Sequence, residues 1–254
     1  MKVKNILVSQ TPPLDFEKSP YADLKKKYSI NIEFFKFFKF SPVSAADFRK
    51  TKINILDHTA IIFSSTTTID YFFTLLKEMR LEIPESMKYF CPTDQVAYYL
   101  QKYISYKKRK VFYAKNNSPS GVFELISKNR DLKYLLPCGS EMIYSQYCEF
   151  LNEEGIEHNQ AVVFNTVPAE FPEKFDISQF DMIVFFSNSG VASLKSNYPD
   201  FEQGEMAFAA LGSAAADAVR AEGWTLHVEA PTKEAPSITI ALDHFLKEHA
   251  TRRR

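Results

Sequence analysis

Four short clusters of small polar residues stand where apolar, strand-like runs of the sequence end. Small residues let a ligand approach the backbone, and the N–H groups that open a following helix favour a carboxylate or a phosphate. One such cluster alone is typical of a helix N-cap, whereas four in one chain indicate an anionic ligand. We expect the following residues to bind it: Ser64, Ser65 and Thr66; Gly139 and Ser140; Ser187, Asn188, Ser189 and Gly190; and Gly212, Ser213 and Ala214.

Other chemistries lack a pattern in this chain. The nucleotide-binding motifs GxGxxG and GxxxxGK[ST] are absent, and so is the GxSxG elbow of serine hydrolases. The three cysteines, Cys91, Cys138 and Cys148, form no CxxC pair and are expected to be buried free thiols, and the five histidines have no metal-ligand spacing. We therefore expect no metal and no dinucleotide or P-loop nucleotide, and no residue is identified as catalytic.

Charge and hydropathy restrict the partners. The formal net charge is zero, with 31 basic and 31 acidic residues, which argues against nucleic acid as a partner. The basic runs 25–27, 107–110 and 252–254 are interpreted as solvated faces or a tail. No apolar stretch approaches the roughly 18–20 residues that span a bilayer, and the N-terminus lacks a secretory pattern, so we expect a cytoplasmic protein with no membrane contact.

The elements that position the clusters alternate between strand-like and helix-like patterns. Helical spacing is clearest after residue 66, and Ser19 followed by Pro20 predicts a helix N-cap with proline in the first turn. This alternation predicts an α/β fold of two flavodoxin-like domains with parallel sheets; a closed (β/α)8 barrel is the alternative. The expected strands are Val3–Val8, Thr59–Phe63, Met87–Cys91, Lys110–Ala114, Lys133–Pro137, Ala161–Phe164, Met182–Phe186, Ala207–Leu211 and Thr225–Glu229.

Two extended segments mark the domain boundaries. Asn31–Pro42 and Phe164–Pro172 both end near proline and are interpreted as paired crossovers, a two-stranded connector. The prediction is a discontinuous domain of residues 1–38 plus 169–254, with residues 42–165 inserted as a second domain.

The same junctions resemble the uroporphyrinogen-III synthase family, and the resemblance runs nearly end to end. It is carried by ordered blocks, of which FFSNSGVASL and FAALGSAAADAVRAEG in the C-terminal part are the best. AIIFSSTTTI (Ala60–Ile69), the stretch from Leu135 to Val167 that contains PCGS, and VEAPTKEAPSITIAL (Val228–Leu242) follow the same order and spacing.

The resemblance implies a cofactor-independent lyase with two α/β domains. Its substrate would be hydroxymethylbilane, a linear tetrapyrrole with many carboxylate arms, which it would cyclise to uroporphyrinogen III with loss of water and inversion of the last ring, in haem or sirohaem biosynthesis. The cyclisation passes through a cationic azafulvene and a spiro intermediate, so holding the right conformation is the main task of such an enzyme. A monomer in transient contact with hydroxymethylbilane synthase is expected.

The chain departs from the family where side-chain roles are suspected. Phe164 replaces a tyrosine, Ala214 and Ala215 replace two threonines, Thr67 replaces an arginine, and Ala207 stands where a lysine can occur. One interpretation is that backbone N–H groups hold the carboxylates, with Ser64, Ser187 and Ser189 as additional donors. The other is a diverged, non-catalytic protein that binds a tetrapyrrole or another anion. A two-domain sensor of small anions or sugars is a third reading.

Backbone binding carries an expectation for mutagenesis. If the amides hold the ligand, replacing Gly190 or Gly212 by valine should damage turnover more than removing the hydroxyl of Ser187.

Overall fold

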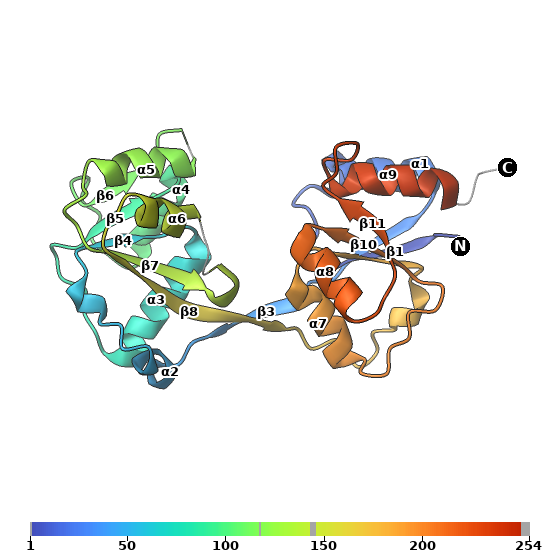
Figure 1. The fold of residues 1–254 in the computed structure, drawn as a ribbon, viewed down its shortest axis with the longest axis horizontal. Coiled ribbons are helices and arrows are strands. Elements are labelled where there is room, and N and C mark those ends of the chain that lie inside the picture. The colour runs from blue at the N-terminus through green and yellow to red at the C-terminus, as the bar shows by residue number, and fades with distance from the viewer. Residues whose placement is uncertain (1, 117, 143–145, 250–254) are drawn as a thin grey trace. The chain divides into compact units, whose positions relative to one another are not determined.

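The computed structural model describes residues 2–116, 118–142 and 146–249. The chain divides into two compact units, one formed by Met1–Lys39 with Val167–Arg254 and the other by Phe40–Thr166. The chain leaves the first unit along strand β3 (Phe38–Pro42) and returns along β8 (His158–Pro168), and these two strands pair with each other (Figure 1). The described part of the chain contains one five-stranded and one six-stranded sheet, so it is not a closed barrel.

Unit 1 is a parallel sheet in the order β11-β10-β9-β1-β2. Numbered within the unit, this is the flavodoxin order 2-1-3-4-5, with its topological switch point between β1 and β9. The strands are β1 (Asn5–Val8), β2 (Asn31–Phe34), β9 (Met182–Phe185), β10 (Ala207–Leu211) and β11 (Leu226–Ala230). The α-helices are α1 (Pro20–Tyr28), α7 (Asn188–Asn197), α8 (Ser213–Ala221) and α9 (Ile238–His249).

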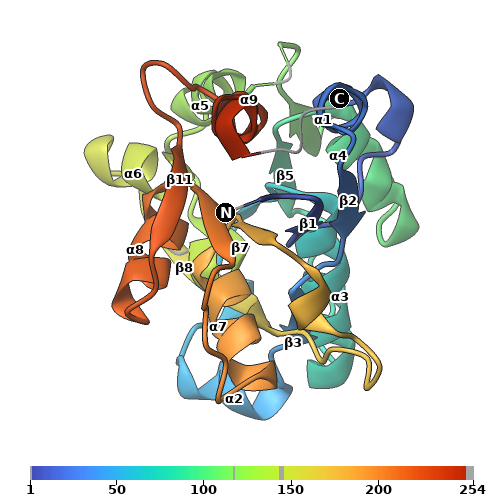
Figure 2. The ribbon, with the colours of Figure 1, turned by 90° about the vertical axis from the view of Figure 1, so that its right-hand side faces the viewer.

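Helices cover both faces of this sheet (Figures 1 and 2). Successive strand residues point to opposite faces, so Met182 and Val184 pack with α1 and α9, whereas Ile183 and Phe185 pack with α7 and α8. Both faces are therefore apolar, which explains the uninterrupted run MIVF in β9.

Unit 2 is built on the same plan with a different strand order, β3-β8-β7-β4-β5-β6. Strands β4 to β8 pair in parallel, and their order within the unit is 3-2-1-4-5, with the switch point between β4 and β7. The remaining strands are β4 (Ala60–Ile62), β5 (Lys88–Cys91), β6 (Val111–Tyr113) and β7 (Tyr134–Gly139). The α-helices are α2 (Ala45–Lys50), α3 (Thr66–Met79), α4 (Asp94–Tyr99), α5 (Pro119–Ser127) and α6 (Gln146–Glu153).

Helices also cover both faces of the unit 2 sheet. Ile61 and Tyr89 pack with α2, α3 and α4, whereas Ile62 and Phe90 pack with α5 and α6. The aromatic content of the chain lies largely in these layers, for example where the Phe90 ring meets Tyr134 edge-on at 5.3 Å.

Local structure differs from the sequence-based prediction in two segments of the N-terminal part of the chain. Asn31–Pro42 is not one extended crossover but two strands, β2 and β3, because residues 31–34 pair with β1 as the edge of sheet 1. Ser19 precedes α1, with Pro20 in its first turn, but its hydroxyl donates to the Phe16 carbonyl at 2.6 Å and does not cap the helix. The preceding 3-10 turn, Phe16–Lys18, supplies that acceptor.

Within the described residues, no helix combines the length and apolarity needed to cross a membrane. The basic run 252–254 lies outside the described residues.

Candidate functional site

The predicted clusters follow strands that are neighbours in each sheet. In unit 1, Ser187–Gly190 follows β9 and Gly212–Ala214 follows the adjacent β10. In unit 2, Ser64–Thr66 follows β4 and Gly139–Ser140 closes the adjacent β7. Because the carboxyl ends of parallel strands meet at one edge, each unit gathers two clusters beside its switch point, where α/β proteins place ligands.

Helix α8 begins with its first N–H groups uncapped by any side chain. Its N-cap, Gly212, has φ +88° and ψ 150°, a conformation that only glycine adopts easily, and it brings no hydroxyl to the first turn. The first N–H groups of a helix have no partner within the helix, so those of Ser213 and Ala214 are available to an acceptor. Both residues are exposed, and the helix dipole adds to the attraction for an anion.

Helix α7 begins differently although it follows the neighbouring strand. Its N-cap is Ser187, whose Oγ accepts from the N–H of Gly190 at 3.2 Å and lies 3.1 Å from the Oγ of Ser189. Ser189 is buried, and Asn188 is exposed at the first helical position. The Gly190 N–H is therefore already used, whereas the backbone N–H of Asn188, at the first helical position, has no partner within the helix.

In unit 2 the hydroxyls of the Ser64–Thr66 cluster are engaged with the helix that follows. Ser65 caps α3 by accepting from the N–H of Thr68 at 3.2 Å, and its hydroxyl lies 2.9 Å from the Thr68 hydroxyl. Ser64 also reaches the Thr68 hydroxyl, at 3.5 Å. Thr66 and Thr67 open the helix and are partly exposed, so their backbone N–H groups are the donors left for a ligand here.

Gly139 gives room to a ring of the protein itself. A Cβ on Gly139 would lie 2.4 Å from Cε2 of Phe164, which faces it across the irregular register of β7 and β8. Phe164 is 4% exposed and packs against Phe40 and Tyr71 at 4.7 and 5.0 Å. Ser140 accepts from the Thr166 N–H at 3.3 Å. Both residues of this junction therefore contact β8, and the Phe164 ring occupies the space where a Cβ on Gly139 would lie.

Sequence reasoning missed Ser9, which follows β1 directly across the unit 1 switch point from β9. Its N–H donates to the Val184 carbonyl at 3.0 Å, and its buried hydroxyl has no partner in the described residues. A Cβ on Gly190 would lie 3.5 Å from that Oγ. The signal was present, because Ser9-Gln10-Thr11 ends an apolar run in the same way as the other clusters.

A second missed residue is Lys233, an exposed cation in the loop that follows β11. That strand neighbours β10, and the Gly212 N–H donates to Ala230 of β11 at 2.7 Å. Lys233 is thus a basic side chain in the loop after β11, and β11 is the neighbour of the strand that leads into α8.

Other titratable groups give no sign of a metal centre. Within residues 2–116, 118–142 and 146–249, no group of three His, Cys, Asp or Glu side chains could hold a metal ion. Cys91 and Cys138 are buried free thiols, as expected, and burial raises the pKa of Cys138 to about 11. The expectation is wrong for Cys148, which is partly exposed because Tyr147 and Leu151 form the buried face of α6 and Cys148 lies beside that face, with its sulfur 3.5 Å from the His158 ring.

Comparison with known proteins identifies one family. The model of the family described as uroporphyrinogen-III synthase HemD matches residues 19–239. No curated protein matches the chain significantly.

Solved structures of similar fold cover nearly the whole chain. Uroporphyrinogen-III synthetase from Helicobacter pylori matches at 16% identity and a TM-score of 0.51, covering 96% of this chain and 99% of that one. A mutant uroporphyrinogen III synthase from the bacterium Thermus thermophilus matches at 12% identity and a TM-score of 0.46, covering 96% and 98%. At such identity the Helicobacter structure supports the two-domain α/β fold and nothing finer.

Proposed function

The chain belongs to the uroporphyrinogen-III synthase HemD family, and from this premise we propose that it cyclises hydroxymethylbilane to uroporphyrinogen III with loss of water and inversion of the last ring. The observation that carries the proposal is the family match over residues 19–239. The uncapped first turn of α8 supports it because the proposed substrate is rich in carboxylates.

In this proposal the chain's residues bind and orient the substrate, which carries the reactive groups. The donors that we propose for carboxylate arms are, in unit 1, the N–H groups of Ser213 and Ala214 in α8 and of Asn188 in α7. In unit 2, considered by itself, they are the N–H groups of Thr66 and Thr67 in α3, and none of these side chains need be reactive. The pyrrole nitrogen of the substrate expels the hydroxyl, which leaves as water, and the substituted carbon of the last ring attacks the methylene carbon of the resulting azafulvene cation. Holding that ring in position selects the spiro path over direct closure.

A non-catalytic binding protein of the same fold is the second candidate. It is favoured by Phe164, which is buried without a hydroxyl where the family resemblance implies a tyrosine. Under backbone binding, a ring at this position has a packing role, because it fills the space left by Gly139.

The test is an isomer assay. The purified protein is incubated with hydroxymethylbilane, the product is oxidised, and the uroporphyrin isomers are separated by chromatography. We expect isomer III to dominate, against isomer I in a control with heat-denatured protein. An isomer ratio equal to the control would contradict the proposal, and substrate binding without a change in ratio would favour the second candidate.

The remaining expectations belong to the same proposal. We expect activity to survive dialysis against a chelator, because no step needs a cofactor. We expect a cytoplasmic monomer, checked by sedimentation, with hydroxymethylbilane synthase as a transient partner. An activity restored only by added metal would contradict cofactor independence.

A further inference from the structure

Unit 2 contains a pocket of about 390 Å³ far from its strand-end clusters. Met87 and Tyr89 lie at the amino end of β5 and Lys110 precedes β6, so the pocket opens at the opposite edge of the sheet from Ser64 and Gly139. Its volume falls in the range of small-molecule sites in proteins. The proposed function makes no use of it.

The body of the pocket is apolar and partly aromatic. Phe73, Leu76, Leu81, Ile83 and Ile104 line it. A flat wall comes from Tyr103, whose ring stacks on Phe73 at 4.4 Å with 2° between the planes. Such a surface favours a planar aromatic ligand.

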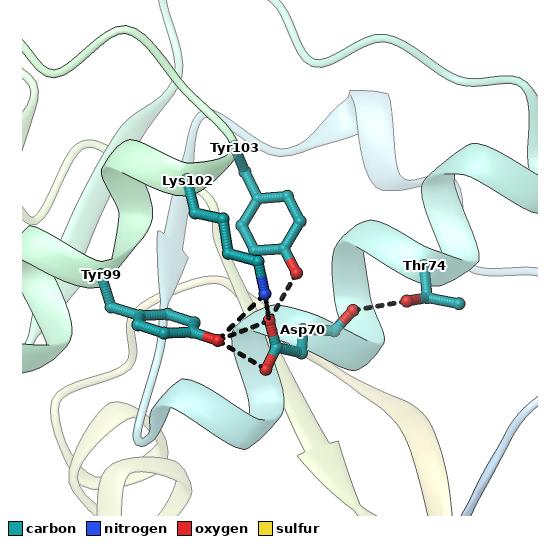
Figure 3. Close-up of polar contacts among 5 residues, drawn as sticks. All are labelled: Asp70, Thr74, Tyr99, Lys102 and Tyr103. Carbon is teal, nitrogen blue, oxygen red and sulfur yellow. Dashed lines mark hydrogen bonds and ion pairs between the residues drawn. The ribbon is translucent and has the colours of Figure 1, made fainter.

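This wall is held in place by a carboxylate outside the pocket, that of Asp70 in α3 (Figure 3). Asp70 accepts from the hydroxyls of Tyr103 and Tyr99, the latter at 2.8 Å, and pairs with Lys102 at 3.0 Å. Partial burial acts to raise the pKa of Asp70, but these donors outweigh it and the pKa is lowered. The hydrogen bond to the Asp70 carboxylate holds the Tyr103 ring in position before a ligand binds, so binding need not order the ring.

A tyrosine hydroxyl belongs to the lining residues. Tyr89 lines the pocket and is 4% exposed. Burial raises the pKa of Tyr89 to about 12, so the group stays protonated and can donate. Because Tyr89 lines the pocket, its hydroxyl is a donor for a ligand oxygen there.

At the rim, two lysines share one loosely held anion. Glu85 lies 3.4 Å from the ammonium of Lys107 and 3.7 Å from that of Lys110. The Lys110 side chain is only 16% exposed, whereas Glu85 is 86% exposed. Because Glu85 is solvated, its ion pairs with the two lysines are weak, and another anion can replace it. Lys77 also lines the pocket, and Glu82 is the other carboxylate there, leaving cations in excess.

We propose that this pocket binds a small planar aromatic carboxylate, whose ring lies along Tyr103 and Phe73 and whose carboxylate replaces Glu85 between Lys107 and Lys110. The Tyr89 hydroxyl donates to an oxygen of the ligand. Of the basic run 107–110, Lys107 and Lys110 therefore bind the ligand. Lys108 and Arg109 are exposed and do not line the pocket.

Calorimetric titration with sodium 2-naphthoate tests this site in the intact chain. We expect a Kd of about 0.1–1 mM, and binding about 10-fold weaker for the neutral 2-naphthol. Lys110→Met should weaken naphthoate about 10-fold and Tyr89→Phe about 3-fold. Glu85→Gln removes the competing anion and should tighten binding about 3-fold.

Two further variants locate the ligand. Ser105→Trp, at an exposed position of the rim, should abolish binding, whereas Lys108→Met should leave it unchanged. Circular dichroism melting checks that each variant folds. Equal affinity for naphthoate and naphthol, no binding at about 5 mM (roughly 5- to 50-fold the expected Kd), or insensitivity to Lys110→Met and Ser105→Trp would each overturn the proposal. None of these results depends on the isomer assay.

Discussion

Helices α7 and α8 follow adjacent strands of the same sheet, yet they open in opposite ways. At α7 the hydroxyl of Ser187 takes up the N–H of Gly190, whereas at α8 Gly212 has no side chain and leaves the first donors uncapped. A small polar sequence at a strand end can therefore serve the helix itself or leave donors for a ligand. Only the N-cap residue distinguishes the two.

The glycines of these turns differ in the same sense. Gly212 has a positive φ, so any other residue is strained there even though a Cβ would meet nothing within 4 Å. Gly190 lies inside the helix, and a Cβ on it would make ordinary contacts at 3.5–3.7 Å. The sequence-based expectation treated both glycines alike, and the structure separates them.

The largest effect is expected for Gly212→Ala. Because an L-residue is strained at φ +88°, the free energy of unfolding of unit 1 should fall by about 1–3 kcal/mol. Urea denaturation followed by the fluorescence of Trp224, the single tryptophan, reports on this unit because the ring packs on Phe208. A loss below about 0.5 kcal/mol, the usual limit for a neutral surface change, would mean that the turn relaxes.

A smaller effect is expected for Ser187→Ala. The variant loses the bond to the Gly190 N–H, which should cost about 1 kcal/mol in the same denaturation experiment. Ser213→Ala is the matched control, because Ser213 caps nothing and is exposed. Equal losses in the two variants would show that the capping contrast between α7 and α8 is not real.

The smallest effect is expected for Gly190→Ala. The added methyl fits, and replacing glycine within a helix should raise the stability of unit 1 by about 0.5–1 kcal/mol. The contact between this methyl and the Ser9 hydroxyl decides whether the stability rises or falls. A clear loss of stability would indicate that this part of the switch point is packed more tightly than the distances imply.

Hydrophobic pattern was enough to predict most of the fold. Runs such as Ala207–Leu211 are buried on both faces, and their composition alone marks them as central parallel strands. Edge strand β2 was missed because residues 31–34 alternate between exposed and half-buried and merge with the connector. The short helix α2 carries too few apolar positions to show a period, with Ala45 and Phe48 as its buried residues.

The placement of the four clusters was predictable from the sequence, but their hydrogen bonds were not. Ser, Thr and Gly at strand ends lie at the carboxyl edge of each sheet, because that edge follows from parallel topology. Which donors are available depends on contacts between distant residues. The Phe164 ring reaches Gly139 only through the irregular pairing of β7 with β8, and the role of Ser9 depends on β1 lying beside β9.

The central claim is that the free N–H groups of α8 bind a carboxylate of the substrate. Proline is well accepted at the first helical position but has no N–H, so Ser213→Pro removes one donor and keeps the helix, while Ser213→Ala removes only the hydroxyl. With hydroxymethylbilane as substrate, kcat/KM for isomer III should fall about 10–100-fold for Ser213→Pro and stay within about 2-fold for Ser213→Ala. Equal rates for the two folded variants would contradict backbone binding at this turn.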